Sequence, residues 1–264
     1  AAMVRTFLAG RATANAFAAV VGVDIKVVDI GVAADLPDHP DLIAAKIRRG
    51  TGNAAREPAM SPDEALAALE RGSDLAVEAI RDGAELIAIG EMGIGNTASA
   101  ALLLHRLAPA ALDLCIGLGA GQDDAGLARK RAALERAAAR SDATAPFDVL
   151  CEFGGLEIAG MAGAVIGAAS ERRPVIVDGF ISSAAALTAI RLCPAARDYC
   201  IFAHRSSERG HAILLDALDA MPLLDLALRL GEGSGAFLAV PLVRAAARLL
   251  TDVATLDDVL SGKI

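Results

Sequence analysis

A glycine-rich loop carries the densest group of residues that could do chemistry. Residues Gly90–Thr97 read Gly-Glu-Met-Gly-Ile-Gly-Asn-Thr and separate an expected strand from an expected helix. Gly93 and Gly95 would let the backbone approach a ligand closely, and the free N–H groups at the start of the helix would suit a phosphate. Glu91 would end the strand with its carboxylate facing a crevice. The alternative is a tight turn with Glu91 only solvated, and the loop alone favours neither.

The same loop contains the pattern G-x-G-x-x-A of dinucleotide-binding proteins, from Gly93 to Ala98. That pattern works with an acidic residue at the end of the next strand, which holds the ribose hydroxyls. The next expected strand ends at Gly117, and its acidic residue, Asp113, lies near its beginning. The sequence also contains no P-loop and no G-x-S-x-G nucleophile motif. A nicotinamide-cofactor dehydrogenase is therefore the weaker interpretation.

A second glycine-rich loop, Gly117–Asp124, follows that strand. Gly119 and Gly121 would again bring backbone amides close to an anion. Lys130, one of only four lysines in the chain, falls in the next expected helix and could reach a phosphate as a point charge. The alternative for Lys130 is an ordinary place on a solvated helix face. The neighbouring glycines favour the phosphate interpretation.

Two polar loops follow later strands. Asp178 ends an expected strand, and its carboxylate would either cap the next helix or accept a hydrogen bond from a ligand hydroxyl. The loop His204–His211 contains His and Ser, including Ser206, but no carboxylate at a spacing that defines a catalytic triad. We interpret it as a polar lining of the crevice and not as a hydrolase site.

A fifth loop, Leu230–Gly235, places Glu232 between glycines and between apolar helical segments. A carboxylate in such a place would be partly desolvated and suited to general-base work. The alternative is a surface glutamate in a flexible loop. Taken alone, the loop favours this second interpretation.

The elements around these loops repeat one order: strand, loop, helix. This order predicts right-handed crossovers and a mainly parallel, doubly wound sheet of the Rossmann-like α/β class, which binds ligands beyond the carboxyl ends of its strands. The expected strands are 24–30, 84–90, 112–117, 173–178 and 199–203. The expected helices after the first 20 residues are 97–107, 124–140, 182–191 and 211–218, together with one that a capping box at Ser61–Glu64 opens and that ends near Gly72.

The ends of the chain are expected to be helical. Helical periodicity begins at Met3 and continues to Val20, and it returns after Pro222. We therefore predict a large α/β nucleotide-binding domain over residues 21–221. Residues 1–20 and 222–264 would form a small helical subdomain.

Composition excludes several classes of function. The formal net charge of −8 argues against nucleic acid as a partner. The 60 alanines and 25 glycines predict close backbone packing of helices on a sheet. Four widely spaced cysteines without a C-x-x-C pair indicate neither a metal site nor a disulfide framework, and a reduced cytoplasmic setting fits them. No targeting or membrane segment is recognisable.

Four strings in order go beyond generic pattern. They are Gly90–Thr97, Phe153–Ala159, Val177–Ile181 and Arg229–Gly235. Together they closely resemble the nicotinate-nucleotide–dimethylbenzimidazole phosphoribosyltransferase family of cobalamin biosynthesis, over nearly the whole chain. The resemblance implies transfer of phosphoribose from nicotinate mononucleotide to 5,6-dimethylbenzimidazole, giving α-ribazole 5′-phosphate and nicotinate. It also implies a homodimer with a Rossmann-like large domain and no cofactor.

The resemblance assigns roles to the residues of these loops. Glu232 matches the general base, which takes a proton from the benzimidazole, and Leu230 matches a residue that packs against the base. The phosphate-binding positions are Gly119, Gly121 and Lys130. The remaining substrate-binding positions, near the nicotinate, the reacting centre and the pocket wall, are Glu91, Gly93, Gly95, Asn96, Thr97, Asp178 and Ser206.

Two departures from the family pattern keep an alternative open. Family members have a further segment before the helix that opens this chain, and that segment helps to cover the benzimidazole. Leu118 and Ala120 stand where the family often has Arg and Thr. The alternative is a divergent or truncated homologue that binds nucleotide or base without turnover, or that uses another azole or a phenolic acceptor.

Overall fold

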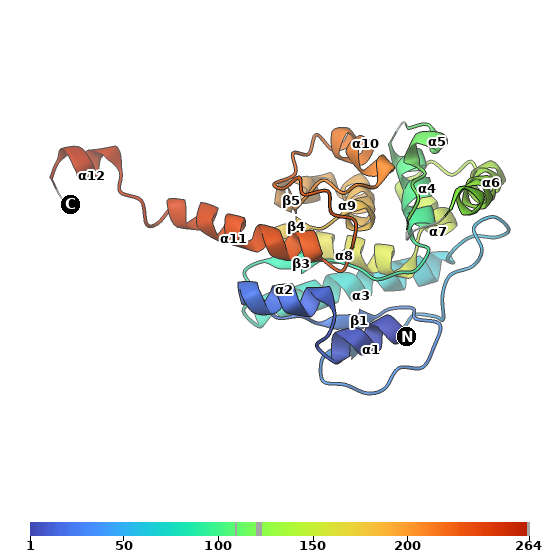
Figure 1. The fold of residues 1–264 in the computed structure, drawn as a ribbon, viewed down its shortest axis with the longest axis horizontal. Helices are drawn as coiled ribbons and strands as arrows, with labels where there is room; N and C mark the ends of the chain where they lie inside the picture. The colour runs from blue at the N-terminus through green and yellow to red at the C-terminus, as the bar shows by residue number, and fades with distance from the viewer. Residues whose placement is uncertain (109, 120–122, 263–264) are drawn as a thin grey trace.

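A computed structural model describes residues 1–108, 110–119 and 123–262, and a three-stranded parallel sheet lies at its centre (Figure 1). The strands are β3 (Ile87–Ile89), β4 (Val175–Val177) and β5 (Cys200–Phe202), in the order β3-β4-β5. Ile87 pairs with Val175, and Val175 pairs with Cys200, so the three carboxyl ends meet at one edge. The strands expected at 84–90, 173–178 and 199–203 are confirmed in shortened form.

Helices cover both faces of this sheet. Val175 and Val177 point into the main core, with residues of α8 (Leu156–Ser170) and α9 (Phe180–Leu192). Ile176 points to the other face, where it packs on α11 (Ser234–Leu249). All three residues of β4 are buried, because alternate side chains of a central strand point to opposite faces that are both covered. The predicted doubly covered sheet is confirmed.

Helix α3 (Pro62–Arg81) packs along α8 with very little space between the two backbones. A Cβ atom at Gly163 would lie 1.9 Å from the carbonyl oxygen of Leu69, and one at Gly72 would lie 1.8 Å from that of Gly160. The capping box at Ser61–Glu64 is confirmed. The predicted end near Gly72 is wrong, because this glycine continues the helix and serves its close packing.

The strand expected at 112–117 is also wrong. Residues Leu112–Cys115 form the short helix α5, and irregular backbone follows. Cys115 and Ile116 are buried in the main core, beside α4 (Thr97–Leu107), and not at an edge of the sheet. The apolar residues of this run therefore serve burial between helices, which a short apolar pattern cannot distinguish from burial in a strand.

The helices that follow the glycine-rich loops agree closely with expectation. Helices α4 and α6 (Asp124–Arg140) have the predicted bounds. Helices α9 and α10 (Arg209–Ala217) each begin two residues before their predicted starts. The other elements that join these parts are α7 (Pro146–Phe153) and the 3-10 helix η1 (Pro194–Tyr199).

A separate two-stranded parallel sheet precedes α3. It consists of β1 (Val27–Asp29), inside the strand expected at 24–30, and β2 (Leu42–Ala44), which the sequence pattern did not predict. The helical pattern at the start of the chain forms two helices, α1 (Ala2–Leu8) and α2 (Thr13–Val21), because the chain turns at Gly10 with φ +67°.

The last helices extend from the body as an arm (Figure 1). The helix expected from Pro222 begins only at Ser234, and α12 (Leu256–Leu260) ends the arm. The first half of α11 packs on the sheet and on α2, where Ala14, Ala18 and Phe237 form a small core. The division into domains 21–221 and 1–20 with 222–264 stays a prediction. Across the described ranges, we find no helix with the length and apolar character needed to cross a bilayer.

Candidate functional site

The loop Leu230–Gly235 lies directly on the carboxyl end of β3. A Cβ atom at Gly90 would be 2.3 Å from the backbone nitrogen of Gly233. The backbone N–H of Glu232 donates to the carbonyl oxygen of Glu91 over 3.0 Å. Two glycine-containing loops about 140 positions apart in the chain are thereby joined at the edge where ligands of such sheets bind.

Glu232 is held in an unusual conformation at this junction. Its φ is +61°, and the flanking Gly231 and Gly233 also have positive φ, at +80° and +73°. A non-glycine residue in this region is uncommon and is concentrated at functional sites. The residue is only 8% exposed, and its Oε2 accepts a hydrogen bond of 3.3 Å from the backbone N–H of Ala14. Glu232 is therefore a fixed, buried carboxylate and not a mobile surface glutamate.

Asp178 anchors the same loop from beneath. Its Oδ2 accepts a hydrogen bond from the N–H of Gly233, and its Oδ1 accepts from the N–H groups of Gly235 and Ala236. The Nε2 of His204 lies 3.5 Å from Oδ1. Of the two roles considered for Asp178, capping is the one observed, but the helix is the distant α11 and not the next helix, α9. A carboxylate at a helix N-terminus is favoured by the helix dipole.

Glu91 shares its surroundings with a second carboxylate, Glu157, in the first turn of α8. The Oε2 of Glu91 accepts hydrogen bonds from the N–H of Gly93 and the Nδ2 of Asn96. Burial raises the pKa of the Glu91 carboxyl, the two N–H donors oppose the rise, and the charges of Glu157 and Asp178 add to it. Glu157 is not among the site residues expected from the sequence. It was the one charged residue in an apolar helix that begins with two glycines, which was the available signal.

A cavity of about 310 Å³ opens at the end of the loop Gly90–Thr97, between the N-termini of α4 and α6. Lys130 lines it, and its Nζ donates to the Thr97 hydroxyl and to the Gly117 carbonyl oxygen, each over 2.9 Å. Burial lowers the pKa of Lys130, and the charge of Glu208 opposes that change. The other lining residues are Gly95, Ala98, Gly126 and Arg129. Two helix N-termini with a lysine and an arginine are a suitable place for an anion.

The structure brings several of the predicted substrate-binding residues to this cavity. Gly95, Thr97 and Lys130 line it directly. Gly119 has φ +63°, and a Cβ atom there would lie 3.0 Å from the Thr97 hydroxyl and 3.6 Å from Nζ of Lys130. Gly121 lies outside the described residues. Arg129 was missed, because nothing in its local sequence separates it from the other arginines of α6.

Ser206 and Leu230 occupy different depths of the site. Ser206 is buried, and its backbone N–H donates to Nδ1 of His211, whose Nε2 is 3.0 Å from the Ser183 hydroxyl. Burial, with the charges of His204 and Arg205, lowers the pKa of His211 to about 3. Leu230 is 50% exposed, so it is free to cover a flat apolar ligand.

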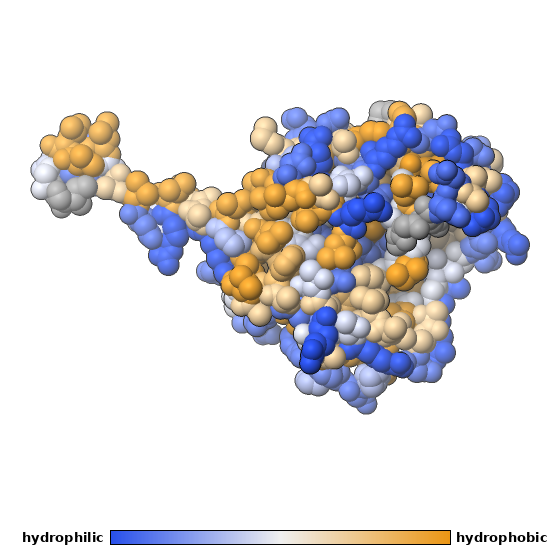
Figure 2. All heavy atoms as spheres, viewed as in Figure 1, coloured by the Kyte–Doolittle hydropathy of each residue, from blue (hydrophilic) through white to orange (hydrophobic). Residues whose placement is uncertain are grey.

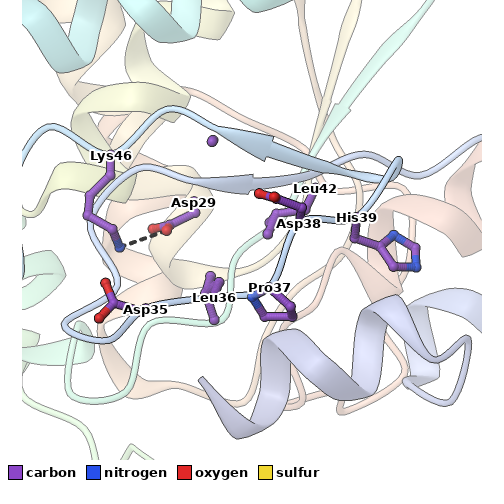
Figure 3. A pocket seen from close by; sticks show the side chains of 9 residues that line it. Asp29, Asp35, Leu36, Pro37, Asp38, His39, Leu42 and Lys46 are labelled. Atoms are coloured by element: carbon purple, nitrogen blue, oxygen red, sulfur yellow. Dashed lines mark ion pairs between the residues drawn. The ribbon is translucent and has the colours of Figure 1, made fainter.

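A second cavity, of about 260 Å³, lies beside β1 and β2 (Figure 3). The buried carboxylate of Asp29 forms an ion pair of 2.7 Å with Nζ of Lys46 in its wall. Asp35, Asp38 and His39 also line it. In the part of the chain that the structure describes, no three His, Cys, Asp or Glu side chains are grouped to hold a metal ion.

Comparison with known proteins agrees with this geometry. A family model described as Phosphoribosyltransferase matches residues 1–259. The chain belongs to this phosphoribosyltransferase family. The dehydrogenase interpretation of Gly93–Ala98 is therefore wrong.

Known relatives align with almost the whole of this chain. It is 52% identical to nicotinate-nucleotide–dimethylbenzimidazole phosphoribosyltransferase of Cupriavidus necator, over 97% of this chain and 74% of the relative. It is 51% identical to the protein of the same name from Chloroflexus aggregans, over 96% of this chain and 72% of the relative. A crystal structure of CobT from Thermus thermophilus superposes with a TM-score of 0.91 at 46% identity, covering 94% of this chain and 75% of that one. The predicted Rossmann-like α/β fold is confirmed.

Proposed function

We propose that this phosphoribosyltransferase moves phosphoribose from nicotinate mononucleotide to 5,6-dimethylbenzimidazole and releases nicotinate. The names of its relatives from Cupriavidus necator and Chloroflexus aggregans support this substrate pair. The observation that carries the proposal is the pairing of one fixed, buried carboxylate, Glu232, with the cavity at Lys130. Backbone contact through Glu91 links these two parts.

The phosphate of the nucleotide would bind at the start of α4 and α6. The first turns of both helices line the cavity, and Lys130 and Arg129 supply positive charge. Gly95 with φ +93° allows the loop to bend around the phosphate. An acidic chain can hold an anion in this way, because the favourable charges are local.

The transfer itself would be a displacement at C1′ of the ribose. One ring nitrogen of the benzimidazole attacks C1′ with its lone pair, while the bond from C1′ to the pyridine nitrogen breaks and its electrons stay on nicotinate. Glu232 takes the proton from the other ring nitrogen, which leaves the benzimidazole ring uncharged. Attack opposite to the departing nicotinate inverts C1′ and gives the α linkage. Glu91 would stabilise positive charge that develops at C1′.

Asp178 would act by position. Its two oxygens already accept three backbone N–H groups, which hold the loop that carries Glu232. We assign Leu230 to the face of the benzimidazole and Ser206 to the buried support of the pocket wall.

Nicotinate release tests the proposal. Purified protein is mixed with nicotinate mononucleotide, with and without dimethylbenzimidazole, and nicotinate and α-ribazole 5′-phosphate are followed by chromatography and mass spectrometry. We expect both products only when the base is present. Nucleotide binding without release would overturn transfer in favour of a binding protein. Release with another azole or a phenol, but not with dimethylbenzimidazole, would identify a divergent acceptor.

We also propose that the enzyme is a homodimer that works in the cytoplasm. The arm formed by the end of α11 and by α12 exposes Leu249, Leu250, Val253, Leu256 and Leu260, each by more than half of its surface (Figure 2). Apolar side chains exposed together on a protruding helix suit an interface. Light scattering after size exclusion should give twice the chain mass, and Leu250→Glu with Leu256→Glu should give the monomer.

The cytoplasmic location is supported by the three buried free thiols, because thiols stay reduced in that compartment. Cell fractionation tests this location.

A further inference from the structure

Glu157 is a charged residue that the proposed transfer step does not use. It lies in the first turn of α8, whose other residues are apolar or small. A glutamate in a first turn has an ordinary explanation, since it interacts favourably with the helix dipole. That explanation alone requires no neighbour from another part of the chain, whereas the Glu157 carboxylate lies against the loop that carries Glu91.

The carboxylate of Glu157 faces the loop of Glu91 at close range. A Cβ atom at Gly93 would lie 3.0 Å from Oε1 of Glu157 and 2.3 Å from Nδ2 of Asn96. The same Asn96 amide donates to Oε2 of Glu91 over 2.5 Å, and it lies near enough to Glu157 to lower the pKa of that carboxyl. One buried amide therefore lies close to two carboxylates from different elements of the fold.

The charges that raise the pKa of Glu91 are both negative. Glu91 faces Glu157 from α8 and Asp178 from the end of β4, and both raise its pKa in addition to burial. Burial is also the main reason that the pKa of Glu157 is raised, and the Asn96 amide opposes it. The Glu91 carboxylate also accepts a hydrogen bond from the N–H of Gly93, and the N–H of Glu232 donates to the backbone oxygen of Glu91. Two like charges in such a place are costly unless one is neutralised.

We propose that Glu157 is a positioning residue for phosphoribosyl transfer: from its place beside Gly93 and the Asn96 amide, its carboxylate acts on the neighbouring Glu91 carboxylate and helps to hold it in place. This inference rests on the proposed function, in which Glu91 stands near the reacting C1′. Positive charge on the substrate would be attracted by both carboxylates, which offsets the repulsion between Glu91 and Glu157. The pair thereby favours the state in which C1′ is most positive.

The pH dependence of kcat/KM tests this role with Glu157→Gln, which keeps the shape of the side chain and removes its charge. Because the Glu157 charge raises the pKa of Glu91, its removal should move the acidic limb of the profile to lower pH by roughly one unit. Glu157→Asp retains the charge, so the acidic limb of its kcat/KM profile should lie at the same pH as in the wild type. Glu171→Gln at the other end of α8 is the matched control and should leave the profile unchanged.

A purely structural role would change stability or kcat without moving the limb, and an unmoved limb in a folded Glu157→Gln protein overturns the proposal. If Glu157→Gln does not fold, Asn96→Ser removes the amide and should move the limb to higher pH. A carbon-13 NMR titration of the Glu91 carboxyl requires no turnover. An inactive wild type would overturn the proposed function, while an equal Glu91 titration in wild type and Glu157→Gln would overturn the role of Glu157.

Discussion

The side chain of Glu232 and the backbone N–H of Ala14 are joined by a hydrogen bond across 218 positions of the chain. Ala14 lies in the first turn of α2, whose free N–H groups and dipole favour a nearby carboxylate. The same helix packs on α11 through Ala14, Ala18 and Phe237. The proposed general base is thus fixed by both ends of the chain.

Replacing Glu232 with Gln should lower kcat by roughly 10²–10⁴-fold. The amide oxygen can still accept the Ala14 hydrogen bond, but the side chain can no longer take the proton from the benzimidazole. The dissociation constant of nicotinate mononucleotide, measured by calorimetry, should change little. Glu135→Gln on the exposed side of α6 is the control. Unchanged turnover in Glu232→Gln would rule out the general-base role.

Lys130→Met should raise KM for nicotinate mononucleotide by roughly ten- to a hundredfold, the usual value of a hydrogen bond to a charged group. The variant keeps the length of the side chain and removes the ammonium that lies beside Thr97. Steady-state kinetics measure the effect, with the exposed Arg136→Met of the same helix as control. The riboside without phosphate should not distinguish Lys130→Met from the wild type. An equal loss with the riboside would contradict a phosphate role.

His211 should make folding less stable in acid. Its pKa is lowered to about 3 in the folded protein, so between pH 6.5 and 3 the unfolded chain binds the proton and the folded chain does not. The free energy of unfolding should therefore decrease, as pH falls through this range, by up to about 1.4 kcal/mol per unit more in the wild type than in His211→Gln. Urea titrations at several pH values measure the difference. Parallel curves would contradict it.

Gly163→Ala should destabilise the fold by about 1–3 kcal/mol, the usual cost of overpacking. In an open helix the same change would stabilise, because alanine has the higher helix propensity. Here the added Cβ atom meets the backbone oxygen of Leu69, which cannot move without shifting α3. Chemical denaturation measures the change. A variant as stable as the wild type would show that α3 and α8 have room to separate.

Local patterns were sufficient for much of the fold. The bounds of α4 and α6 and the capping box at Ser61 follow from short-range preferences for capping and helical periodicity, and these survive in the structure. The strand predicted from the apolar run 112–117 was wrong, because a short apolar pattern is the same for a buried strand and for a short helix packed between others. The helix end predicted near Gly72 was wrong, because this position needs a small residue where α3 packs against α8, and not because the helix ends there.

The order of residues along the chain already indicates which loops carry chemistry, since glycines and carboxylates at the ends of strands are local facts. Packing of the whole chain selects which of these residues meet. It places Asp178 under the start of α11, brings Glu157 to Asn96, and closes α2 over Glu232. Such contacts join residues far apart in the chain, and they form only when the helices and strands between them have packed.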